Sequence, residues 1–257
     1  MQVALRIALV TALASASLAA AEFHFTYAGP EDSPAWNGLQ LGVAEANVQG
    51  KFLGTTFTLE RTSPDAERQH EPIAVFTANN GRIASLSNRA GERAVFNLSD
   101  GDDAIRSACI ANAFHAIPSN KMKQDAVAQW KKKDPAAEVS AAAWHSAAVK
   151  FSARDLNKRY AKKFGKPMDE QAWAGWFAAR TAADTLMRNT DAGPAELVVL
   201  LKDGEFDGQK GDPHSFRKNG QLRQPLMIIS AAGELLGEAP VRGIATDLDS
   251  LGSTTCE

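Results

Sequence analysis

Residues 72–103 read PIAVFTANNGRIASLSNRAGERAVFNLSDGDD, and this stretch decides the fold class. Two apolar runs within it, residues 72–77 and 94–98, have the length and the content of β-branched and aromatic residues typical of strands buried in a parallel sheet. A weak helix is predicted between them, over residues 82–89. A strand, a helix and a strand in this order form a βαβ unit, so the sequence predicts an α/β fold with a doubly wound, mostly parallel sheet.

The chain before this stretch has the same alternation of elements. Residues 23–27 alternate between apolar and polar side chains and predict a strand, and residues 55–59 predict a second one. Between them, a helix is expected to begin after Ser33 and Pro34 and to end at Gly50.

Beyond residue 118 the pattern changes to helices. Ser119 is expected to cap a helix that runs to about residue 133. Residues 134–188 are predicted to be helical, with one break at residues 165–167, and a last helix is predicted over residues 194–202.

The end of the chain predicts a hairpin. Asn219-Gly220 stands between two extended segments, residues 213–217 and 226–230, and both residues of this pair readily adopt the positive φ of a tight turn. The tail from residue 233 onward is expected to be mostly loop.

Residues 1–21 are expected to be a secretory signal peptide. Arg6 precedes a stretch of apolar and small residues, and the alanines before Glu22 fit cleavage after Ala21. A membrane anchor would need about 20 strongly apolar residues, whereas this stretch is short and rich in Ala and Ser. The mature protein is therefore expected outside the cytoplasm, without a membrane span. With 28 basic and 30 acidic residues, the chain has no basic excess that would favour nucleic acid.

Cys109 and Cys256 are the two cysteines of the chain. An oxidising compartment favours a disulfide between them, and two unpaired thiols are the alternative. The histidines are scattered singly and do not have the spacing of a zinc site.

Several motifs, taken in order, carry a resemblance to a known family. The first, WNGLQLGVAEAN at residues 36–47, is similar to the opening of type I periplasmic binding proteins of the Leu/Ile/Val class. Later motifs resemble a branch of that class, the ABC-transporter substrate-binding proteins found with PQQ-dependent alcohol dehydrogenase systems. These later motifs are DDAIR (102–106), HAIPS (115–119), FDGQKG (206–211), SFR (215–217), GQLRQP (220–225) and LDSLG (248–252).

The resemblance implies a periplasmic solute-binding component of an ABC-type importer, without catalysis and without a cofactor. Its expected partners are a small-molecule solute and an ABC permease or a periplasmic PQQ dehydrogenase. No motif of a serine hydrolase, metalloprotease or nucleotide-binding loop is present. A third possibility is an accessory or scaffold protein of a calcium- or lanthanide-dependent PQQ dehydrogenase system that no longer captures solute.

The length of the chain departs from the family. Two full α/β lobes of about 100–200 residues each, plus a tail, need more chain than is present. We therefore expect a shortened member in which most of the second lobe is missing and a reduced, largely helical part takes its place. The expected organisation is a signal peptide (1–21), an α/β lobe (22–133), a helical segment packing back on that lobe (134–203), and a hinge, hairpin and tail (204–257).

The resemblance also implies the binding residues. In the family, loops at the carboxyl ends of the strands hold the polar part of the ligand, which agrees with the general rule for open α/β sheets. The alternative is that these residues simply form turns. The expected ligand-binding residues are Asn79, Asn80, Ser99 and Asp100, with Tyr27 and Trp36 as walls of the site.

A metal site is not expected, although one acidic cluster raises the question. Asp100, Asp102 and Asp103 could offer carboxylate oxygens to calcium or a lanthanide, as hard cations require. The same residues also fit a solvated loop that caps a helix, and they lack the full ligand pattern of an EF-hand.

Overall fold

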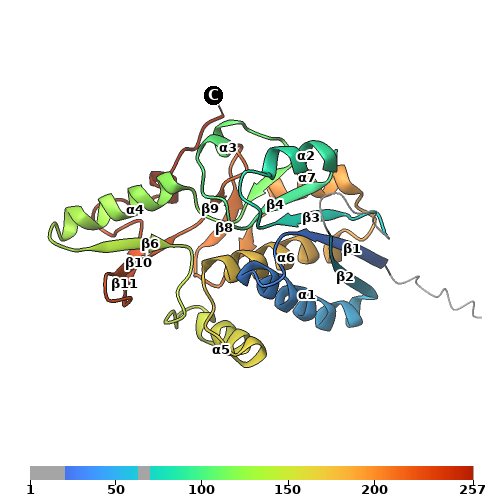
Figure 1. Ribbon diagram of the computed structural model, residues 1–257, viewed down its shortest axis with the longest axis horizontal. Coiled ribbons are helices and arrows are strands. Elements are labelled where there is room, and N and C mark those ends of the chain that lie inside the picture. Colours follow the sequence, from blue (N-terminus) through green and yellow to red (C-terminus); the bar gives the residue numbers. More distant parts are fainter. Residues whose placement is uncertain (1–20, 63–69, 257) are drawn as a thin grey trace, which may run out of the picture.

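The centre of the protein is a parallel sheet of five strands, in the order β2-β1-β3-β4-β5 (Figure 1). The computed structural model describes residues 21–62 and 70–256. Because every neighbouring pair runs parallel, the carboxyl ends of the strands meet at one edge. The predicted α/β class with a doubly wound parallel sheet is confirmed. The strands are β1 (Ala21–Ala28), β2 (Thr55–Arg61), β3 (Ala74–Thr77), β4 (Ala94–Asn97) and β5 (Ala113–His115).

Helices cover both faces of this sheet. Side chains of one face, including Phe25, Phe76 and Phe96, share a core with α1 and α6. Val75 and Val95 on the opposite face pack against α2. The alternation of buried side chains on the two faces is the period-2 pattern of a strand that is covered on both sides. The helices of this main body are α1 (Pro34–Leu53), α2 (Ile83–Ala90), α3 (Ala104–Ser107), α5 (Ala153–Phe164), α6 (Glu170–Arg188) and α7 (Pro194–Asp203).

Glycines bring α1 and α6 into close contact. A Cβ on Gly38 would lie 1.9 Å from the carbonyl oxygen of Ala172, and a Cβ on Gly175 would lie 2.3 Å from that of Ala35. Neither position has room for a side chain, so the two helix backbones approach each other more closely than alanines would allow.

A second, smaller unit lies beyond the carboxyl edge of the main sheet, at the left of Figure 1. It contains α4 (Asn120–Lys133) and a three-stranded antiparallel sheet in the order β11-β10-β6. Its own core includes Met122, Trp130, Leu226 and Ile228. We call this part the small unit; its strands are β6 (Val139–Ala142), β10 (Leu226–Ser230) and β11 (Leu235–Ala239).

The small unit corrects two of the secondary-structure predictions. Residues 139–142 form a strand rather than a helix, because β6 pairs with β10, and this long-range pairing overrides the helix preference of alanine. The tail is also less irregular than expected, because β11 follows residue 233. Helix α4 packs against β6, β10 and β11 of the small unit.

A turn forms in the predicted place, but its central residues are Lys218 and Asn219 rather than Asn219 and Gly220, and only Gly220 of the predicted pair has a positive φ. Its strands also differ from the prediction. Gly220 has a φ of 75°, and its N–H donates to the Arg217 carbonyl at 2.8 Å. The hairpin joins β8 (Pro213–Phe216) to β9 (Leu222–Arg223), and β8 also pairs with β7 (Phe206–Asp207). Pro225 lacks an N–H and ends this pairing, so β10 leaves for the small unit.

Helix α1 also ends later than predicted, at Leu53 rather than at Gly50. Gly54, with a φ of 68°, is the left-handed residue that caps it. Gly50 lies inside the helix, where a Cβ would come within 2.2 Å of the Thr55 carbonyl oxygen.

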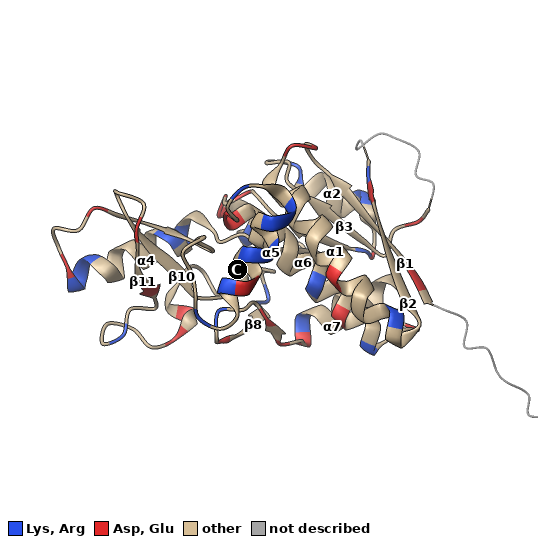
Figure 2. Cartoon of the chain, turned by 90° about the horizontal axis from the view of Figure 1, so that it is seen from below, with Lys and Arg blue, Asp and Glu red and all other residues tan. Residues whose placement is uncertain are grey.

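Basic and acidic residues are interspersed along the helices and loops of the chain (Figure 2). Among the described helices, none has the length and the apolar character needed to cross a bilayer. The expected signal peptide lies outside the described residues, except for Ala21.

Candidate functional site

Four of the predicted binding residues lie together at the carboxyl edge of the main sheet. Asn79 and Asn80 follow β3, and Ser99 and Asp100 follow β4, which is the neighbour of β3. The Ser99 hydroxyl donates to Asn80 Oδ1 at 2.8 Å, and Asp100 Oδ2 accepts the Gly81 N–H at 2.7 Å. The two loops are therefore joined by their own polar side chains.

The same edge is tied to β1 through Asn79. Its side-chain amide donates to the Ala28 carbonyl at 3.2 Å, and the Thr77 hydroxyl donates to the same oxygen at 2.8 Å. The side-chain N–H of Asn79 and both carboxylate oxygens of Asp100 are therefore engaged in holding the loops. Asn80 is exposed and Ser99 is half-buried, so these two have polar groups that a ligand can reach.

Tyr27 and Trp36 lie at the neighbouring strand end, stacked with 5.2 Å between their ring centroids. Tyr27 is fully buried, and its hydroxyl donates to the Pro30 carbonyl at 3.2 Å. Burial raises the pKa of Tyr27, so the hydroxyl stays protonated at neutral pH. Trp36 covers this ring and is partly exposed, which leaves Trp36 as the surface that a ligand would meet.

The acidic cluster is used within the protein. Asp100 Oδ1 accepts the Asp102 N–H at 3.0 Å, and Asp102 Oδ1 accepts the Ala104 N–H at 3.0 Å. Asp103 accepts the N–H of Lys121, at the start of α4. In the described part of the chain, no group of three or more His, Cys, Asp or Glu residues is arranged to hold a metal ion. Asp100, Asp102 and Asp103 therefore act as turn and helix-end acceptors.

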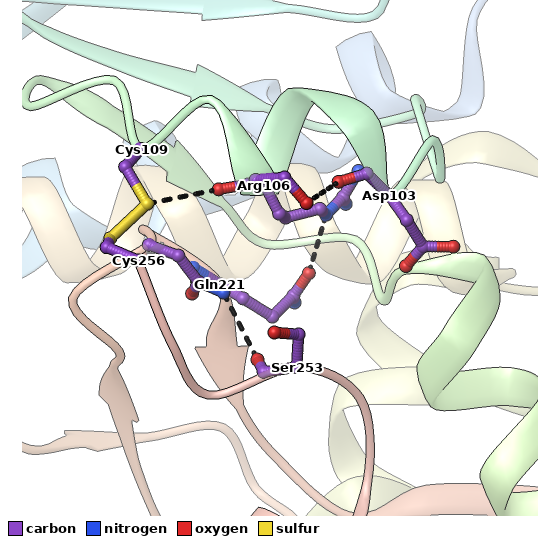
Figure 3. The surroundings of a disulfide bond; sticks show 8 residues. Asp103, Arg106, Cys109, Gln221, Ser253 and Cys256 are labelled. Atoms are coloured by element: carbon purple, nitrogen blue, oxygen red, sulfur yellow. Dashed lines mark hydrogen bonds between the residues drawn. A yellow bond between two sulfur atoms is a disulfide. The ribbon is translucent and has the colours of Figure 1, made fainter.

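A buried polar network lies directly behind this edge. Arg106 is 2% exposed and donates to the carbonyls of Asp100, Asp102 and Ile117 at 2.7, 2.7 and 3.0 Å. Its Nε donates to Gln221 Oε1 at 2.8 Å, as Figure 3 shows. Burial lowers the pKa of Arg106 to about 10, with Asp100 acting in the opposite direction, so the guanidinium remains charged at neutral pH.

Gln221 joins this network to the β8–β9 hairpin. Its side-chain amide donates to the His115 carbonyl at 3.1 Å, and the His115 N–H donates to the Gly220 carbonyl at 2.8 Å. One parallel bridge, between His115 and Gln221, thereby connects the hairpin to the end of β5. Arg106 and Gln221 each lie in one of the sequence motifs, but no local signal in the sequence indicates that the two side chains meet.

The expected disulfide is present between Cys109 and Cys256, with 5.7 Å between their Cα atoms. Figure 3 shows it beside Arg106 and Gln221, where it joins the end of the chain to the segment after α3. Arg217 holds the same tail, donating to the Leu248 and Leu251 carbonyls at 2.8 Å each. Both contacts fix the tail against the hairpin that borders the carboxyl edge.

Comparison with models of known protein families gives no match for this sequence, and comparison with curated proteins gives none either. Comparison with solved structures does give matches. A branched-chain amino acid ABC transporter periplasmic ligand-binding protein from Burkholderia xenovorans LB400 is similar with a TM-score of 0.73 and 12% identity, over 89% of this chain and 96% of that one. The fold is that of periplasmic binding proteins.

Two further structures were solved with a ligand. An ABC transporter substrate-binding protein from Desulfitobacterium hafniense, in complex with Leu, has a TM-score of 0.67 and 16% identity, over 84% of this chain and 100% of its own. A solute-binding protein of an ABC transporter from Rhodopseudomonas palustris BisB5, in complex with 3,4-dihydroxybenzoic acid, has a TM-score of 0.67 and 9% identity. The match covers 84% of this chain and 94% of that one. At these identities the likeness concerns the fold.

Proposed function

We propose that this chain binds a small solute in the periplasm for an ABC-type importer, at the carboxyl edge of its main sheet. The observation that carries the proposal is the meeting of the loops after β3 and β4, joined by the Ser99–Asn80 hydrogen bond. This edge is where open α/β sheets bind ligands. The likeness in fold to substrate-binding proteins supports the same place and the absence of catalysis.

The polar groups left over at this edge favour a ligand with a carboxylate or another acceptor. Asn80 Oδ1 accepts from Ser99, which leaves the Asn80 amide N–H groups as donors toward solvent. The partly exposed ring of Trp36 offers an apolar surface along the same edge. A small amino acid or aromatic acid combines these two features.

Export to the periplasm is part of the proposal. The Cys109–Cys256 disulfide favours an oxidising compartment, which agrees with the expected signal peptide. A link to PQQ-dependent alcohol oxidation rests on the sequence motifs alone. We likewise infer that the second lobe is shortened, since the small unit consists of α4 and three strands.

A thermal-shift screen of the purified mature protein tests the proposal. The panel contains amino acids, short alcohols, aromatic and aliphatic acids, PQQ, Ca²⁺ and lanthanides. We expect a saturable rise in Tm with one class of acid, which a double Asn80→Ala, Ser99→Ala variant reduces. A flat response to every compound would remove the solute-binding function and favour an accessory role in a PQQ dehydrogenase system.

A further inference from the structure

Helix α5 carries a local concentration of positive charge. Residues 150–166, which span α5 and the residues on either side of it, contain seven basic residues and one acidic residue, Asp155. The whole chain contains 28 basic and 30 acidic residues, so this segment differs in the sign of its charge from the rest. Figure 1 shows α5 at the lower edge of the molecule, and Figure 2, viewed from below, shows basic residues along it.

Two of the seven cations attach α5 to the main body. Arg159 Nε lies 2.7 Å from Glu45 Oε1, and the Lys163 ammonium donates to the Gln40 carbonyl at 3.4 Å. Both acceptors belong to α1. The attachment of α5 therefore accounts for these two cations but not for the other five.

The other five cations are exposed, and none of them forms an ion pair with a described residue. Arg154, Lys158 and Lys162 follow one another at four-residue spacing, which places them in one row along the helix. Arg154 stands in the first turn, where the helix macrodipole disfavours a cation, so helix stability does not explain it. The five are Lys150, Arg154, Lys158, Lys162 and Lys166.

Exposed apolar side chains stand beside these cations. Val149 and Phe151 flank Lys150 in the loop before α5, and they are 53% and 58% exposed. Val149 lines one open groove together with Arg154 and Lys158, so the loop and the helix share a surface. Single exposed apolar residues are ordinary, whereas apolar side chains grouped among cations are typical of an interaction surface. We call Val149, Phe151 and the five unpaired cations the basic face.

The loop of the basic face is fixed in place. Phe151 and Ser152 have φ values of 51° and 69°, in the left-handed region that few residues other than glycine adopt. One side of the Phe151 ring lies against Gly211, where an added Cβ would come within 2.7 Å of the ring. The rest of the ring is exposed, so the loop presents an apolar surface without having to rearrange.

We propose that the basic face docks the protein on an anionic lipid bilayer, with the five cations at the phosphate headgroups and the two apolar side chains in the interface. Each Lys or Arg near an anionic membrane surface strengthens binding by about fivefold. An acidic protein segment would meet the same charge. The exposed apolar side chains favour a bilayer, because it covers them without a matching pocket. The docking uses no residue of the carboxyl edge and does not depend on solute binding there.

Vesicle co-sedimentation of the purified mature protein measures the docking. Vesicles of phosphatidylcholine alone are compared with vesicles that also contain about 30% phosphatidylglycerol, at about 0.05 M and about 0.5 M NaCl. At low salt we expect binding to the anionic vesicles to be tighter than to the neutral ones by about tenfold or more. High salt should weaken this binding by about tenfold or more, because it screens exposed charges.

Two triple variants with an equal loss of charge locate the contact. The variant Arg154→Gln, Lys158→Gln, Lys162→Gln removes three cations of the basic face and should weaken binding to anionic vesicles by about tenfold or more. The control replaces the three exposed lysines of residues 131–133, at the end of α4, by Gln and should change binding by about twofold or less. Thermal unfolding of each variant confirms that it is folded.

A tryptophan in the loop reports insertion. Phe151→Trp should gain an emission that brominated anionic vesicles quench, because the ring enters the interface. Val199→Trp, at a position on α7 that is 56% exposed and outside the basic face, should show no added quenching. The variant Val149→Ser, Phe151→Asn should weaken vesicle binding by about fivefold or more and keep its salt dependence.

Four results would overturn the proposal: no binding to anionic vesicles at low salt, equal binding to neutral and anionic vesicles, equal binding by the two triple variants, or no quenching of Phe151→Trp beyond that of Val199→Trp. Binding of a polyglutamate peptide without binding of vesicles would assign the basic face to an acidic protein instead. Loss of acid binding at the carboxyl edge with vesicle binding intact would refute the proposed function alone.

Discussion

Arg106 donates to the side-chain oxygen of Gln221 at 2.8 Å, across 115 positions of the chain. Both residues are buried, and Arg106 also holds three backbone carbonyls around the carboxyl edge. This pair therefore connects the loop after β4, which carries Ser99 and Asp100, to the β8–β9 hairpin. The geometry of the candidate site depends on it.

Replacing Arg106 should destabilise the protein strongly. In Arg106→Met the Gln221 Oε1 and the Asp102 carbonyl lose their donor, whereas the Asp100 and Ile117 carbonyls keep one from Asn97 and Gln221. A buried acceptor left without a donor costs about 1–3 kcal/mol, so we expect a loss of about 2–4 kcal/mol. Urea unfolding measures this loss. Arg154→Met, at an exposed position, is the control and should change the free energy of unfolding by about 0.5 kcal/mol or less. Equal stability of the two variants would contradict the role given to Arg106.

The disulfide should contribute less than its loop length alone predicts. Closing a loop between residues 147 positions apart is worth about 5 kcal/mol in the chain-entropy model. Arg217 holds the tail independently, so the double variant Cys109→Ser, Cys256→Ser should lose about 3 kcal/mol and remain folded. Two free thiols in the unfolded wild-type protein, titrated without reductant, would show that the bond does not form.

Buried histidines should make the protein less stable in mild acid. Burial lowers the pKa of His214 to about 3 and that of His115 well below its ordinary value. The unfolded chain takes up a proton near pH 6.5 and the folded chain does not, so stability is complete above that pH and falls below it. Each histidine contributes a slope of up to about 1.4 kcal/mol per pH unit. Denaturant titrations from pH 7 to pH 4.5 measure it. His214→Phe should reduce the slope, and an unchanged slope would contradict a neutral buried His214.

Adding even a methyl group at the contact between α1 and α6 should destabilise the protein. Gly38→Ala improves helix propensity by about 1 kcal/mol but places a Cβ 1.9 Å from the Ala172 carbonyl oxygen. We expect a net destabilisation of about 2 kcal/mol or more, because the helices must separate. Gly193→Ala is the matched control, since no atom lies within 4 Å of the added Cβ. If both variants were equally stable, the close helix contact would be wrong.

The elements that the sequence predicted are those with local signals. Alternating side chains predict β1, β-branched and aromatic residues predict β2, and short apolar runs predict β3 and β4. The Ser119 cap, whose hydroxyl accepts the Met122 N–H at 3.1 Å, predicts α4. The strands β6 and β11 were missed because they exist through pairing with β10, from which β6 is separated by more than eighty positions. Residues whose composition predicts a helix or a loop can form a strand when another strand is available to pair with them.

The candidate site, too, could be predicted only where local sequence signals and the sheet topology determine it. The loops after β3 and β4 could be placed at one edge because the carboxyl ends of parallel strands must meet there. Sequence reasoning could not show that Asn79 and Asp100 bond their own loops while Asn80 and Ser99 stay accessible. Nor does the sequence show that Arg106 lies beside Gln221, because only the fold brings these two distant segments together.

The most direct test of solute binding at the carboxyl edge is an amide NMR titration of the mature protein with L-leucine and with 3,4-dihydroxybenzoate, the ligand types bound by proteins of similar fold. We predict saturable shifts at Gly81, Ser99 and Asp100 with one of these acids, and at least fivefold weaker binding in the Asn80→Ala, Ser99→Ala variant. Shifts confined to residues away from this edge, or no saturable shift at all, would contradict it.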